Sequence, residues 1–550
     1  MKTATKLLSA TVSIILLTVL SIHGVHQARA QRAHIVILGT TDIHGRIFPL
    51  DYYTNKYDNV GIAKVATLIK EARKNDPDLL LVDSGDTIQG TPLEYYHNKR
   101  HNEPPDPMML TMNTLRYDSM AVGNHEYNFG LKVLEKARSE ARFPWLSGNT
   151  YDTSTHQTHY KPYIIKEVNG VRIGVLGLTT PGIPNWENPP NYSGLEFHET
   201  VSEAKKWVPV LREKEKADLV VITMHMGIEE DLRTGQLNPS QVPNENAGIA
   251  IARQVPGIDV ILLGHTHREV SSLVVNGVLL TQANRWASHI ARVDLYLERT
   301  SGRWRVVAKS ARTIPVTEKT AVDPEIAKLG EPYDKETQAW LDLRIGESSE
   351  QLTAQDCRFH DSGIIDLIQR VQLEAGKADV SMAACFNPQA RIPKGQVTVR
   401  DIAGLYEYEN TLVTLELTGQ QLKDALEHSA QYFRLYEGGR SLAELIDQRV
   451  PGYDFDMAEG VTYEIDLTRP FGQRIQNLKF KGQPLIPTQK LRVVTNNYRV
   501  NGGGRYTMYK GAPVIYRSSA EVRELIIDWV ERNKKIPTQA DNNWRIVPGQ

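Results

Sequence analysis

The sequence predicts a layered α/β domain followed by a second, separate α/β domain. From residue 34 to about 297, short β-rich runs alternate with amphipathic helical stretches, which is the pattern of a sheet covered by helices. This alternation ends around 312–320, and a charged stretch then leads into another set of strands and helices. The chain of 550 residues also exceeds the roughly 100–200 residues of a typical domain.

The strands predicted in the first domain are short and apolar, and polar residues cluster just after several of them. They lie at 34–38, 79–83, 171–178, 219–224 and 260–263. After the first strand, Ile62, Val65, Ile69 and Ala72 fall on one helical stripe, and similar stripes predict helices at 131–140, 198–215 and 246–254. Open α/β sheets bind their ligands at the carboxyl ends of their strands, so we expect a site there.

A linker separates the two predicted domains. We assign residues 31–318 to the first domain, 319–345 to a linker helix and 346–550 to the second domain. The stretch from Asp323 to Arg344 is highly charged, which is typical of a solvated connecting helix and would suit a hinge. In the second domain we expect helices near 362–374, 399–406 and 418–432, and strands near 378–384, 411–417, 461–466 and 491–495.

The composition excludes several classes of protein. Lys and Arg number 64 against 65 Asp and Glu, and 41% of the residues are hydrophobic. This balance excludes a disordered chain and a disulfide-framed miniprotein. A net charge of −1 lacks the positive surplus that binding to long nucleic acid or to an anionic membrane needs. No feature of the sequence indicates an obligate protein partner.

The first thirty residues form a separate segment. Lys2 and Lys6 precede a mostly apolar run over 7–22, and Ala28-Arg29-Ala30 gives the small-x-small pattern that a signal peptidase cuts. The run is short of the roughly 20 residues that span a bilayer, so a retained membrane anchor is the weaker alternative. We therefore expect residues 1–30 to be a signal peptide and the protein to be periplasmic or secreted, without a stable membrane anchor.

Two cysteines, Cys357 and Cys385, lie in the second half of the chain. An oxidising compartment would allow a disulfide between them, and two buried thiols are an equal alternative. Neither belongs to a CxxC pattern, which excludes a cysteine-bound zinc site.

Five polar motifs at strand ends carry the chemical argument. They are Thr41-Asp42-Ile43-His44, Asp83-Ser84-Gly85-Asp86, Gly123-Asn124-His125-Glu126, the strand-ending His225, and Gly264-His265-Thr266-His267. A single Asp or His of this kind is commonly a helix cap or a turn residue. Together, they provide nearly the full ligand set for two divalent ions. Mixed imidazole and carboxylate ligands favour Mn, Zn or Co over Ca or Mg.

Two metal ions about 3.5–4 Å apart are suited to hydrolysis of phosphoesters, because they polarise the phosphoryl oxygens and activate water. The sequence has no Walker lysine loop and no GxSxG elbow, which excludes the main alternative types of hydrolase, those with a P-loop and those with a serine nucleophile. At these residues the sequence resembles the calcineurin-like metallophosphoesterases, and within them the bacterial periplasmic 5′-nucleotidase family, over 34–545. The resemblance implies an N-terminal four-layer domain, joined by a helix to a C-terminal 5′-nucleotidase-type α/β domain.

The resemblance also implies roles for individual residues. One metal ion would be held by Asp42, His44, Asp86 and His267, and the other by Asp86, Asn124, His225 and His265. His125 would not be a ligand but would face the phosphoryl group, to stabilise charge or to protonate the leaving oxygen. The family pattern has Asp where this chain has Asn128. An amide orients an imidazole but does not stabilise its cation as a carboxylate does, and this departure points to a subgroup.

Two motifs in the second domain suggest a base-binding site. Tyr408-Glu409-Asn410 precedes a predicted strand, and Asn496-Asn497-Tyr498-Arg499 precedes Gly502-Gly503-Gly504. Two tyrosines can stack on a nucleobase, and Gly503 would let the backbone approach the ribose. Ordinary packing and a tight turn are the alternative interpretation. The resemblance implies that Tyr408 and Tyr498 enclose the base and that Asn410 binds its edge; Arg391 is a looser candidate for binding an anionic group.

These motifs look like those of the bifunctional 2′,3′-cyclic-nucleotide 2′-phosphodiesterases/3′-nucleotidases, which also carry Asn at the position of Asn128. Gly504 replaces the Asp of many 5′-nucleotidases, so recognition of the ribose should differ. We therefore expect hydrolysis of 2′,3′-cyclic nucleotides to 3′-nucleotides and then to nucleoside and phosphate, with the two domains closing on the substrate. A 5′-nucleotidase or nucleotide-sugar hydrolase with the same metal site is the alternative, and a non-catalytic nucleotide- or metal-binding protein is a remote one.

Overall fold

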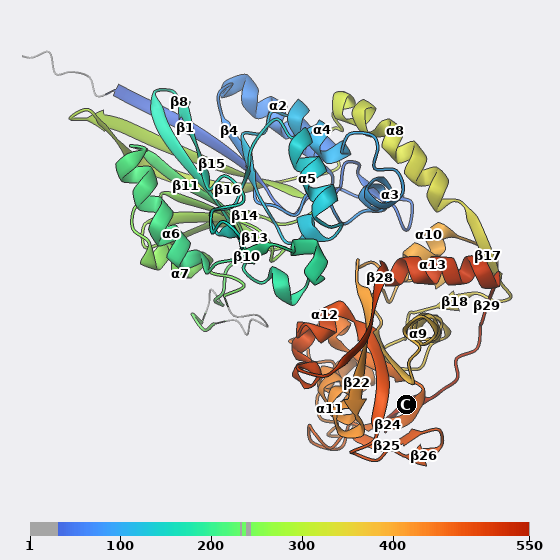
Figure 1. Cartoon of the computed structure of the whole chain (residues 1–550). Coiled ribbons are helices and arrows are strands. Elements are labelled where there is room, and N and C mark those ends of the chain that lie inside the picture. Colours follow the sequence, from blue (N-terminus) through green and yellow to red (C-terminus); the bar gives the residue numbers. More distant parts are fainter. Residues whose placement is uncertain (1–30, 232–233, 238–243, 549–550) are drawn as a thin grey trace, which may run out of the picture.

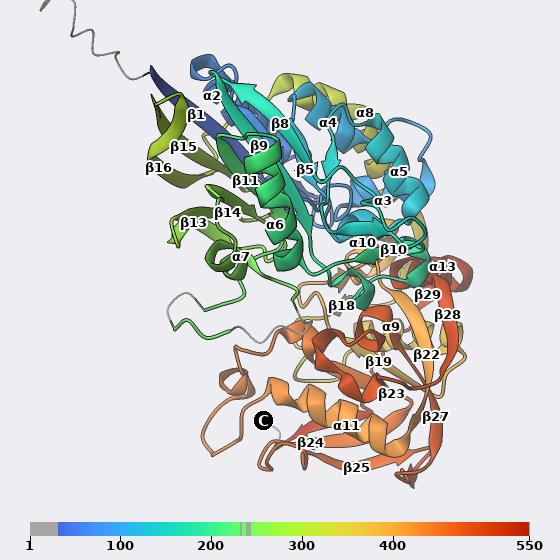
Figure 2. The same ribbon diagram turned by 60° about the vertical axis from the view of Figure 1, so that its left-hand side comes forward.

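The computed structural model describes residues 31–231, 234–237 and 244–548. Figures 1 and 2 show two bodies, with the N-terminal domain above and the C-terminal domain below. The predicted signal peptide, residues 1–30, lies outside the described residues. Within the part of the chain that the structure describes, no helix has the length and apolar character needed to cross a membrane.

The N-terminal domain is built on two six-stranded sheets. The first has the order β16-β15-β1-β4-β5-β6 and the second β13-β14-β12-β11-β9-β8. The strands of the first sheet are β1 (Gln31–Thr40), β4 (Leu80–Asp83), β5 (Ser119–Ala121), β6 (Trp145–Leu146), β15 (His289–Thr300) and β16 (Arg303–Pro315). Those of the second are β8 (Tyr163–Val168), β9 (Val171–Thr179), β11 (Leu219–His225), β12 (Val260–Leu263), β13 (Glu269–Val275) and β14 (Val278–Ala283). Four neighbouring strands in each sheet run parallel. Antiparallel pairing adds a strand at both edges of the second sheet, and adds β15 and β16 at one edge of the first, whose other edge is the parallel strand β6.

The central strands are apolar on both faces because both faces are covered. In β1, Ile35 and Ile37 pack in the core between the two sheets, whereas Val36 and Leu38 pack toward the helices outside. The same alternation recurs in β11, where Val221 faces the other sheet and Ile222 faces outward. Buried parallel strands read as nearly continuous hydrophobic runs for this reason, which is why all five predicted strands are found.

Helices cover both outer faces, so the domain has the predicted four layers. The first sheet is covered by α2 (Ile62–Asn75), α4 (Pro107–Thr114) and α5 (Leu131–Glu140), and the second by α6 (Thr200–Pro209) and α7 (Gly248–Gln254). The helix predicted over 198–215 continues beyond α6 as a π-helical turn, Val210–Lys214. Pro209 lacks an N–H and disturbs the regular ladder at this point.

The connecting helix α8 (Pro324–Leu341) differs from the solvated linker that its charge predicts. Ile326, Gly330, Thr337 and Leu341 are buried along one side, and the helix packs on α3 (Pro92–Arg100) and α4. Figure 1 shows it running down the side of the N-terminal domain toward α10 (Val399–Ala403). Most of its charged side chains are exposed, and Asp334 accepts from the hydroxyl of the buried Tyr52 at 2.8 Å, so α8 is an amphipathic helix anchored to the first domain.

The C-terminal domain is built around a five-stranded sheet, β23-β19-β27-β22-β28. Its strands are β19 (Val380–Ala384), β22 (Thr411–Thr418), β23 (Asp456–Glu459), β27 (Lys490–Asn496) and β28 (Val514–Glu521), and the main helices are α9 (Gly363–Gly376), α11 (Gly419–Ser429) and α13 (Val522–Asn533). Smaller sheets contain β17 (Arg344–Ser348), β21 (Gly395–Thr398) and β29 (Lys535–Ile536), and β24 (Val461–Asp466), β25 (Ile475–Phe480), β26 (Gln483–Pro484) and β30 (Trp544–Val547). A short pair joins β18 (Leu352–Thr353) to β20 (Arg391–Ile392). In this domain α12 (Asn497–Val500) is a single turn, and the remaining short strands, β2 (Leu50–Asp51), β3 (Lys56–Tyr57), β7 (Thr150–Asp152) and β10 (Leu195–Phe197), belong to the N-terminal domain.

The two cysteines form a disulfide, Cys357–Cys385, which decides between the two alternatives. Several hydrogen bonds and an ion pair join the domains. Arg400 donates to the carbonyl of Tyr52, and Lys99 pairs with Glu521 at 3.1 Å. These contacts hold the C-terminal domain against the carboxyl edge of the N-terminal sheets.

Candidate metal centre

The predicted ligands converge where strands of both sheets end. Asp42 follows β1, Asp86 follows β4, Asn124 follows β5, His225 ends β11, and His265 and His267 follow β12. Five of the seven residues adopt left-handed backbone conformations, with φ between 50° and 68°: Asp42, His44, Asp86, His265 and His267. This conformation is uncommon for residues other than glycine and costs energy, and such strain is concentrated at functional sites.

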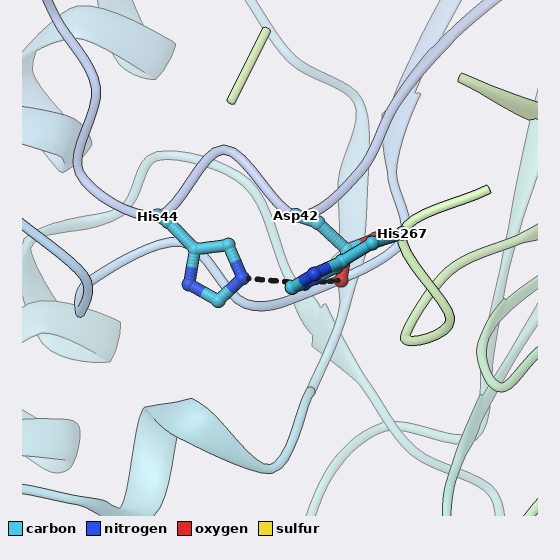
Figure 3. Close-up of side chains that lie close together, drawn as sticks. All are labelled: Asp42, His44 and His267. Carbon is cyan, nitrogen blue, oxygen red and sulfur yellow. Dashed lines mark hydrogen bonds and ion pairs between the residues drawn. The ribbon is translucent and has the colours of Figure 1, made fainter. Parts of the chain in front are cut away.

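The first cluster consists of Asp42, His44 and His267 (Figure 3). The Nε2 atoms of the two histidines are 3.0 Å apart, and His267 Nε2 is 3.4 Å from Asp42 Oδ1. Asp42 is fully buried and His44 nearly so.

The second cluster consists of Asp86, His225 and His265. His225 Nε2 lies 3.0 Å from Asp86 Oδ2 and 3.1 Å from Asn124 Oδ1. Asp86 Oδ2 is also 3.9 Å from His44 Nε2, in the first cluster. Asp86 therefore lies between the two clusters, where the sequence analysis places the bridging carboxylate.

The outer contacts of the histidines fit a metal site. His44 Nδ1 donates to the carbonyl of Gln89 at 3.0 Å, and His225 Nδ1 donates to the carbonyl of Ser84 at 2.8 Å. A carbonyl only accepts, so each ring carries a proton on Nδ1 and leaves Nε2 turned toward the centre. Ligating histidines are oriented in this way. Lone pairs and carboxylate oxygens repel one another unless a proton or a cation lies between them.

Glu126 supports the centre from behind. Its buried carboxylate accepts from the backbone N–H groups of Asp86 at 3.0 Å and Gly123 at 2.7 Å. Gly123 has no room for a side chain, because a Cβ there would lie 2.2 Å from Asp86 Oδ1. The Glu126 carboxylate thus holds the turn that presents Asp86, and Asp86 Oδ1 itself accepts from the backbone N–H of His125 at 2.9 Å.

The electrostatics of the centre favour positive charge. Burial alone would raise the pKa of the Asp86 carboxyl, but His225 and His125 hold it well below its usual range. Burial opposes protonation of His225, yet Asp86 raises its pKa to about 10. Burial and the neighbouring His267 lower the pKa of His44 to about 3, so this ring is neutral. The pocket thus combines a neutral imidazole with ionised carboxylates, which is the donor set for divalent cations.

His125 lies beside the two clusters and not in either of them. Its Nε2 is 4.0 Å from Asp86 Oδ2, and its Nδ1 is 2.5 Å from Asn128 Oδ1. Burial acts against the charged ring, but Asp86 and Asn128 raise the pKa of His125. The Asn128 amide in turn donates to Glu187, a buried residue that the sequence analysis did not identify.

The candidate base-binding residues lie on the face of the C-terminal domain that meets this centre. Tyr408 is 43% exposed, and its ring packs edge-on against Phe386 at 5.1 Å. The ring of Tyr498 lies against Gly503, where a Cβ would be 2.4 Å from two ring carbons. Asn410 accepts from the hydroxyl of Tyr406 at 3.2 Å. Gly503 is therefore in contact with one predicted stacking residue.

Arg391 is not brought to this face by any contact among the described residues. It is exposed on β20, at the β18–β20 pair. Arg358 lies nearer to Tyr408 than Arg391 does. Burial raises the pKa of Tyr408, and the positive charges of Arg285 and Arg358 act on the tyrosine to oppose that rise. Arg358 also donates to the carbonyl of Cys385 at 2.8 Å, and it has no sequence signal beyond following Cys357.

Three links connect the tyrosines to the metal centre. Gln89, whose carbonyl accepts from His44, donates from its side chain to Glu409, next to Tyr408. Arg285 lies 3.1 Å from His267 and acts electrostatically on Tyr408.

On the other side, Glu245 lies 2.9 Å from His265 and acts on the hydroxyl of Tyr498. These contacts connect the candidate base-binding residues to the metal centre across the domain interface.

Comparison with known proteins agrees with this geometry. Residues 35–269 match the family model for calcineurin-like phosphoesterases, and residues 344–511 match that for the 5′-nucleotidase C-terminal domain. A Haemophilus influenzae protein named 2′,3′-cyclic-nucleotide 2′-phosphodiesterase/3′-nucleotidase is 30% identical over 582 residues, which covers 93% of this chain and 87% of that protein. The chain belongs to the 5′-nucleotidase family of calcineurin-like phosphoesterases. It is a metal-dependent phosphoric ester hydrolase of the dimetal class.

Other relatives support the same two-domain fold. The trifunctional nucleotide phosphoesterase YfkN of Bacillus subtilis is 29% identical over 95% of this chain, but the chain spans only 39% of that longer protein. A Staphylococcus aureus protein crystallised with alpha-ketoglutarate superposes with a TM-score of 0.82 at 29% identity, covering 94% of this chain and 100% of that one. The 5′-nucleotidase precursor of Thermus thermophilus superposes with a TM-score of 0.66 at 24% identity, over 94% of this chain and 100% of that one, and shows the shared fold.

Proposed function

We propose that this enzyme hydrolyses 2′,3′-cyclic nucleotides to 3′-nucleotides, and then 3′-nucleotides to nucleoside and phosphate. The observation that supports the proposal is the set of contacts between the surroundings of the tyrosines and the candidate ligands: Gln89 bonds to His44 and to Glu409, beside Tyr408, and Arg285 and Glu245 lie against His267 and His265. A base held between the tyrosines places its ribose, with the phosphate at the 2′ and 3′ oxygens, toward the ligands. Relatives named for this pair of activities cover nearly the whole chain.

We assign one divalent ion to Asp42, His44, Asp86 and His267, and the other to Asp86, Asn124, His225 and His265. When bound, the ions polarise the phosphoryl oxygens and generate a nucleophile from water near neutral pH. Mixed nitrogen and oxygen donors favour Mn, Zn or Co.

The protein's own groups orient the reaction. The carbonyls of Gln89 and Ser84 fix the tautomers of His44 and His225. His125 Nε2 lies 4.0 Å from Asp86 Oδ2, where it stabilises phosphoryl charge or delivers a proton to the leaving 2′ or 3′ oxygen. Tyr408 and Tyr498 hold the base, and Asn410 lies beside them to meet its edge.

A carboxylate already lies against Gly504, which accounts for the absence of an Asp at that position. Asp454 would be 2.5 Å from a Cβ at Gly504, and its carboxylate pairs with Arg499 at 3.1 Å. The ribose-facing loop is thus built differently from one with an Asp in the glycine run. We assign the preference for 2′- and 3′-phosphates to this loop.

The same proposal includes export to the periplasm or beyond the cell, which the first thirty residues support. The proposed reaction requires a small-molecule nucleotide as its partner. Salvage of the products of RNA breakdown is the role that fits an exported enzyme with these substrates.

The tyrosines provide the test. Tyr408→Ala and Tyr498→Ala should each raise KM for 2′,3′-cyclic AMP by about 5- to 140-fold, the equivalent of a stacking energy of about 1–3 kcal/mol. Hydrolysis of bis(4-nitrophenyl) phosphate, which carries no base, should keep its wild-type kinetics. Equal losses on both substrates, or no loss on the nucleotide, would refute the base-binding assignment.

A further inference from the structure

Glu187 ends a short hydrogen-bonded relay to the catalytic histidine. It lies after the 3₁₀ turn Ile183–Asn185 and is 6% exposed. One carboxylate oxygen accepts from the Asn128 side-chain amide, and the other accepts from Asn191 Nδ2 at 2.8 Å. Asn128 Oδ1 then lies 2.5 Å from His125 Nδ1.

The acceptor character of Glu187 fixes the direction of every bond in this relay. A carboxylate has no proton to donate, so Asn128 must turn its NH₂ group toward Glu187. Its carbonyl oxygen then faces His125 and requires a proton on Nδ1. The Nε2 atom is left for the phosphoryl group. Without the acceptor, the Asn128 amide can rotate by 180° and offer His125 a donor, which reverses the tautomer.

The segment that carries Glu187 is clamped from both domains. Within the N-terminal domain, Asn191 Nδ2 also donates to the carbonyl of Asn128 at 3.2 Å. From the C-terminal domain, Asn497 Nδ2 donates to the carbonyl of Trp186 at 2.9 Å.

A second contact between the domains lies one residue beyond Glu187. The side chain of Asn188 is 3.0 Å from the hydroxyl of Thr411. Thr411 follows Asn410, and Asn497 precedes Tyr498, so the base-binding residues adjoin the segment on its other side.

We propose that Glu187 is a positioning residue, which acts through Asn128 to hold His125 with Nε2 toward the phosphoryl group. The proposal rests on the proposed function, because it assumes that His125 acts at the metal centre. It also explains the Asn that this chain has in place of the family's Asp. The carboxylate is still present in the relay, one residue further from the ring.

Exchanging the two side chains tests the relay. In Asn128→Asp, two carboxylates face each other, and in Glu187→Met the side chain offers Asn128 no acceptor; each of these variants should lose about 10- to 100-fold in kcat. Glu187→Gln keeps one acceptor, which can face either Asn128 or Asn191, so it should lose less. In the double variant N128D/E187Q, the Asp accepts from His125 and from the new amide, whose carbonyl accepts from Asn191. Every hydrogen bond is satisfied again, so kcat should recover to within about threefold of wild type, with little change in KM.

The readouts separate positioning from folding. Glu203→Gln is the matched control, because Glu203 is a buried carboxylate bonded to Tyr151 and Trp207 in the same domain. It should change the melting temperature and leave kcat unaltered. If the double variant N128D/E187Q is no more active than Asn128→Asp, or if Glu187→Met has wild-type kcat, the relay is refuted. Melting temperatures of all five variants identify any that fail to fold, and the double variant, with its bonds satisfied, decides the case if a single variant does.

The substrates keep the two proposals distinguishable. The rescue is measured with bis(4-nitrophenyl) phosphate as well as with 2′,3′-cyclic AMP. If the wild-type enzyme hydrolyses the aryl ester but not the cyclic nucleotide, the proposed function is overturned, and the relay can still be tested with the aryl ester. Rescue that is absent on both substrates would overturn the relay alone.

Discussion

Gly503 lies directly against the ring of Tyr498, and replacing it by Ala should displace that ring. A Cβ at this position would be 2.4 Å from two ring carbons and 2.5 Å from a third. Ordinary van der Waals contact begins near 3.4 Å, so the ring must retreat by about 1 Å. Gly503 does not have a positive φ, so Ala adds this contact without backbone strain.

The size of the effect follows from the displacement. A misplacement of about 1 Å in a positioning group costs on the order of 100-fold in activity, and loss of a stacked base costs about 1–3 kcal/mol. We therefore expect Gly503→Ala to raise KM for 2′,3′-cyclic AMP by about 10- to 100-fold. The free energy of unfolding should fall by about 1–3 kcal/mol, as for an overpacked site.

Steady-state kinetics with 2′,3′-cyclic AMP and with bis(4-nitrophenyl) phosphate measure this difference. Gly511→Ala is the matched control, because Gly511 lies outside the glycine run, has a φ of 78°, and a Cβ added there would have no atom within 4 Å. It should cost about 1–3 kcal/mol of stability through backbone strain and leave KM for the nucleotide unaltered. A wild-type KM for Gly503→Ala, or an equal rise in both variants, would refute the reasoning.

Three further predictions concern stability. Gly504→Asp should lower the free energy of unfolding by about 3–5 kcal/mol, because it drives Asp454 from its buried guanidinium partner; chemical denaturation measures this, and an unchanged midpoint contradicts it. Reduction of Cys357–Cys385, which closes a separation of 28 residues, should cost about 3–4 kcal/mol; a melting temperature that is insensitive to reductant contradicts it. Burial and the neighbouring carboxylates raise the pKa of Asp366 to about 8, so the folded state binds this proton more tightly than the unfolded chain, and stability falls as pH rises from about 4 to 8. Asp366→Asn should therefore raise the melting temperature at pH 8 but not at pH 4, and a uniform shift at both would contradict the assignment.

The parts of the fold predicted well are those with a strong local signal. Strands buried on both faces, such as β1 and β11, read as apolar runs, and α2 has a clear stripe. The β15–β16 pair was missed because β16 exposes most of its side chains and carries charge along its length. The packing of α8 on the first domain was missed because its buried residues are outnumbered by charged ones. Both elements owe their position to tertiary contacts, which no local pattern reports.

The same distinction holds at the site. The residues assigned as ligands were predicted because they follow strand ends in recognisable motifs, and the structure brings all seven together; their roles as ligands stay predictions. Glu126 belongs to the third polar motif, but its supporting role was not identified, and Glu187 has no motif signal; each acts through hydrogen bonds to segments distant in the sequence. Arg391 was chosen by loose alignment, and Arg358 is nearer to Tyr408. Residues that support a site are harder to predict than those that form it.

Turnover of three substrates tests the central claim most directly. The purified protein, stripped with chelator and reloaded with Mn²⁺, is given 2′,3′-cyclic AMP, 3′-AMP and 5′-AMP, and products are identified by chromatography. We predict no turnover without metal, fast conversion of the cyclic substrate through 3′-AMP to adenosine with metal, and slow hydrolysis of 5′-AMP. A preference for 5′-AMP would contradict the assigned specificity and leave the metal centre intact, whereas full activity in the metal-free protein would contradict the dimetal site itself.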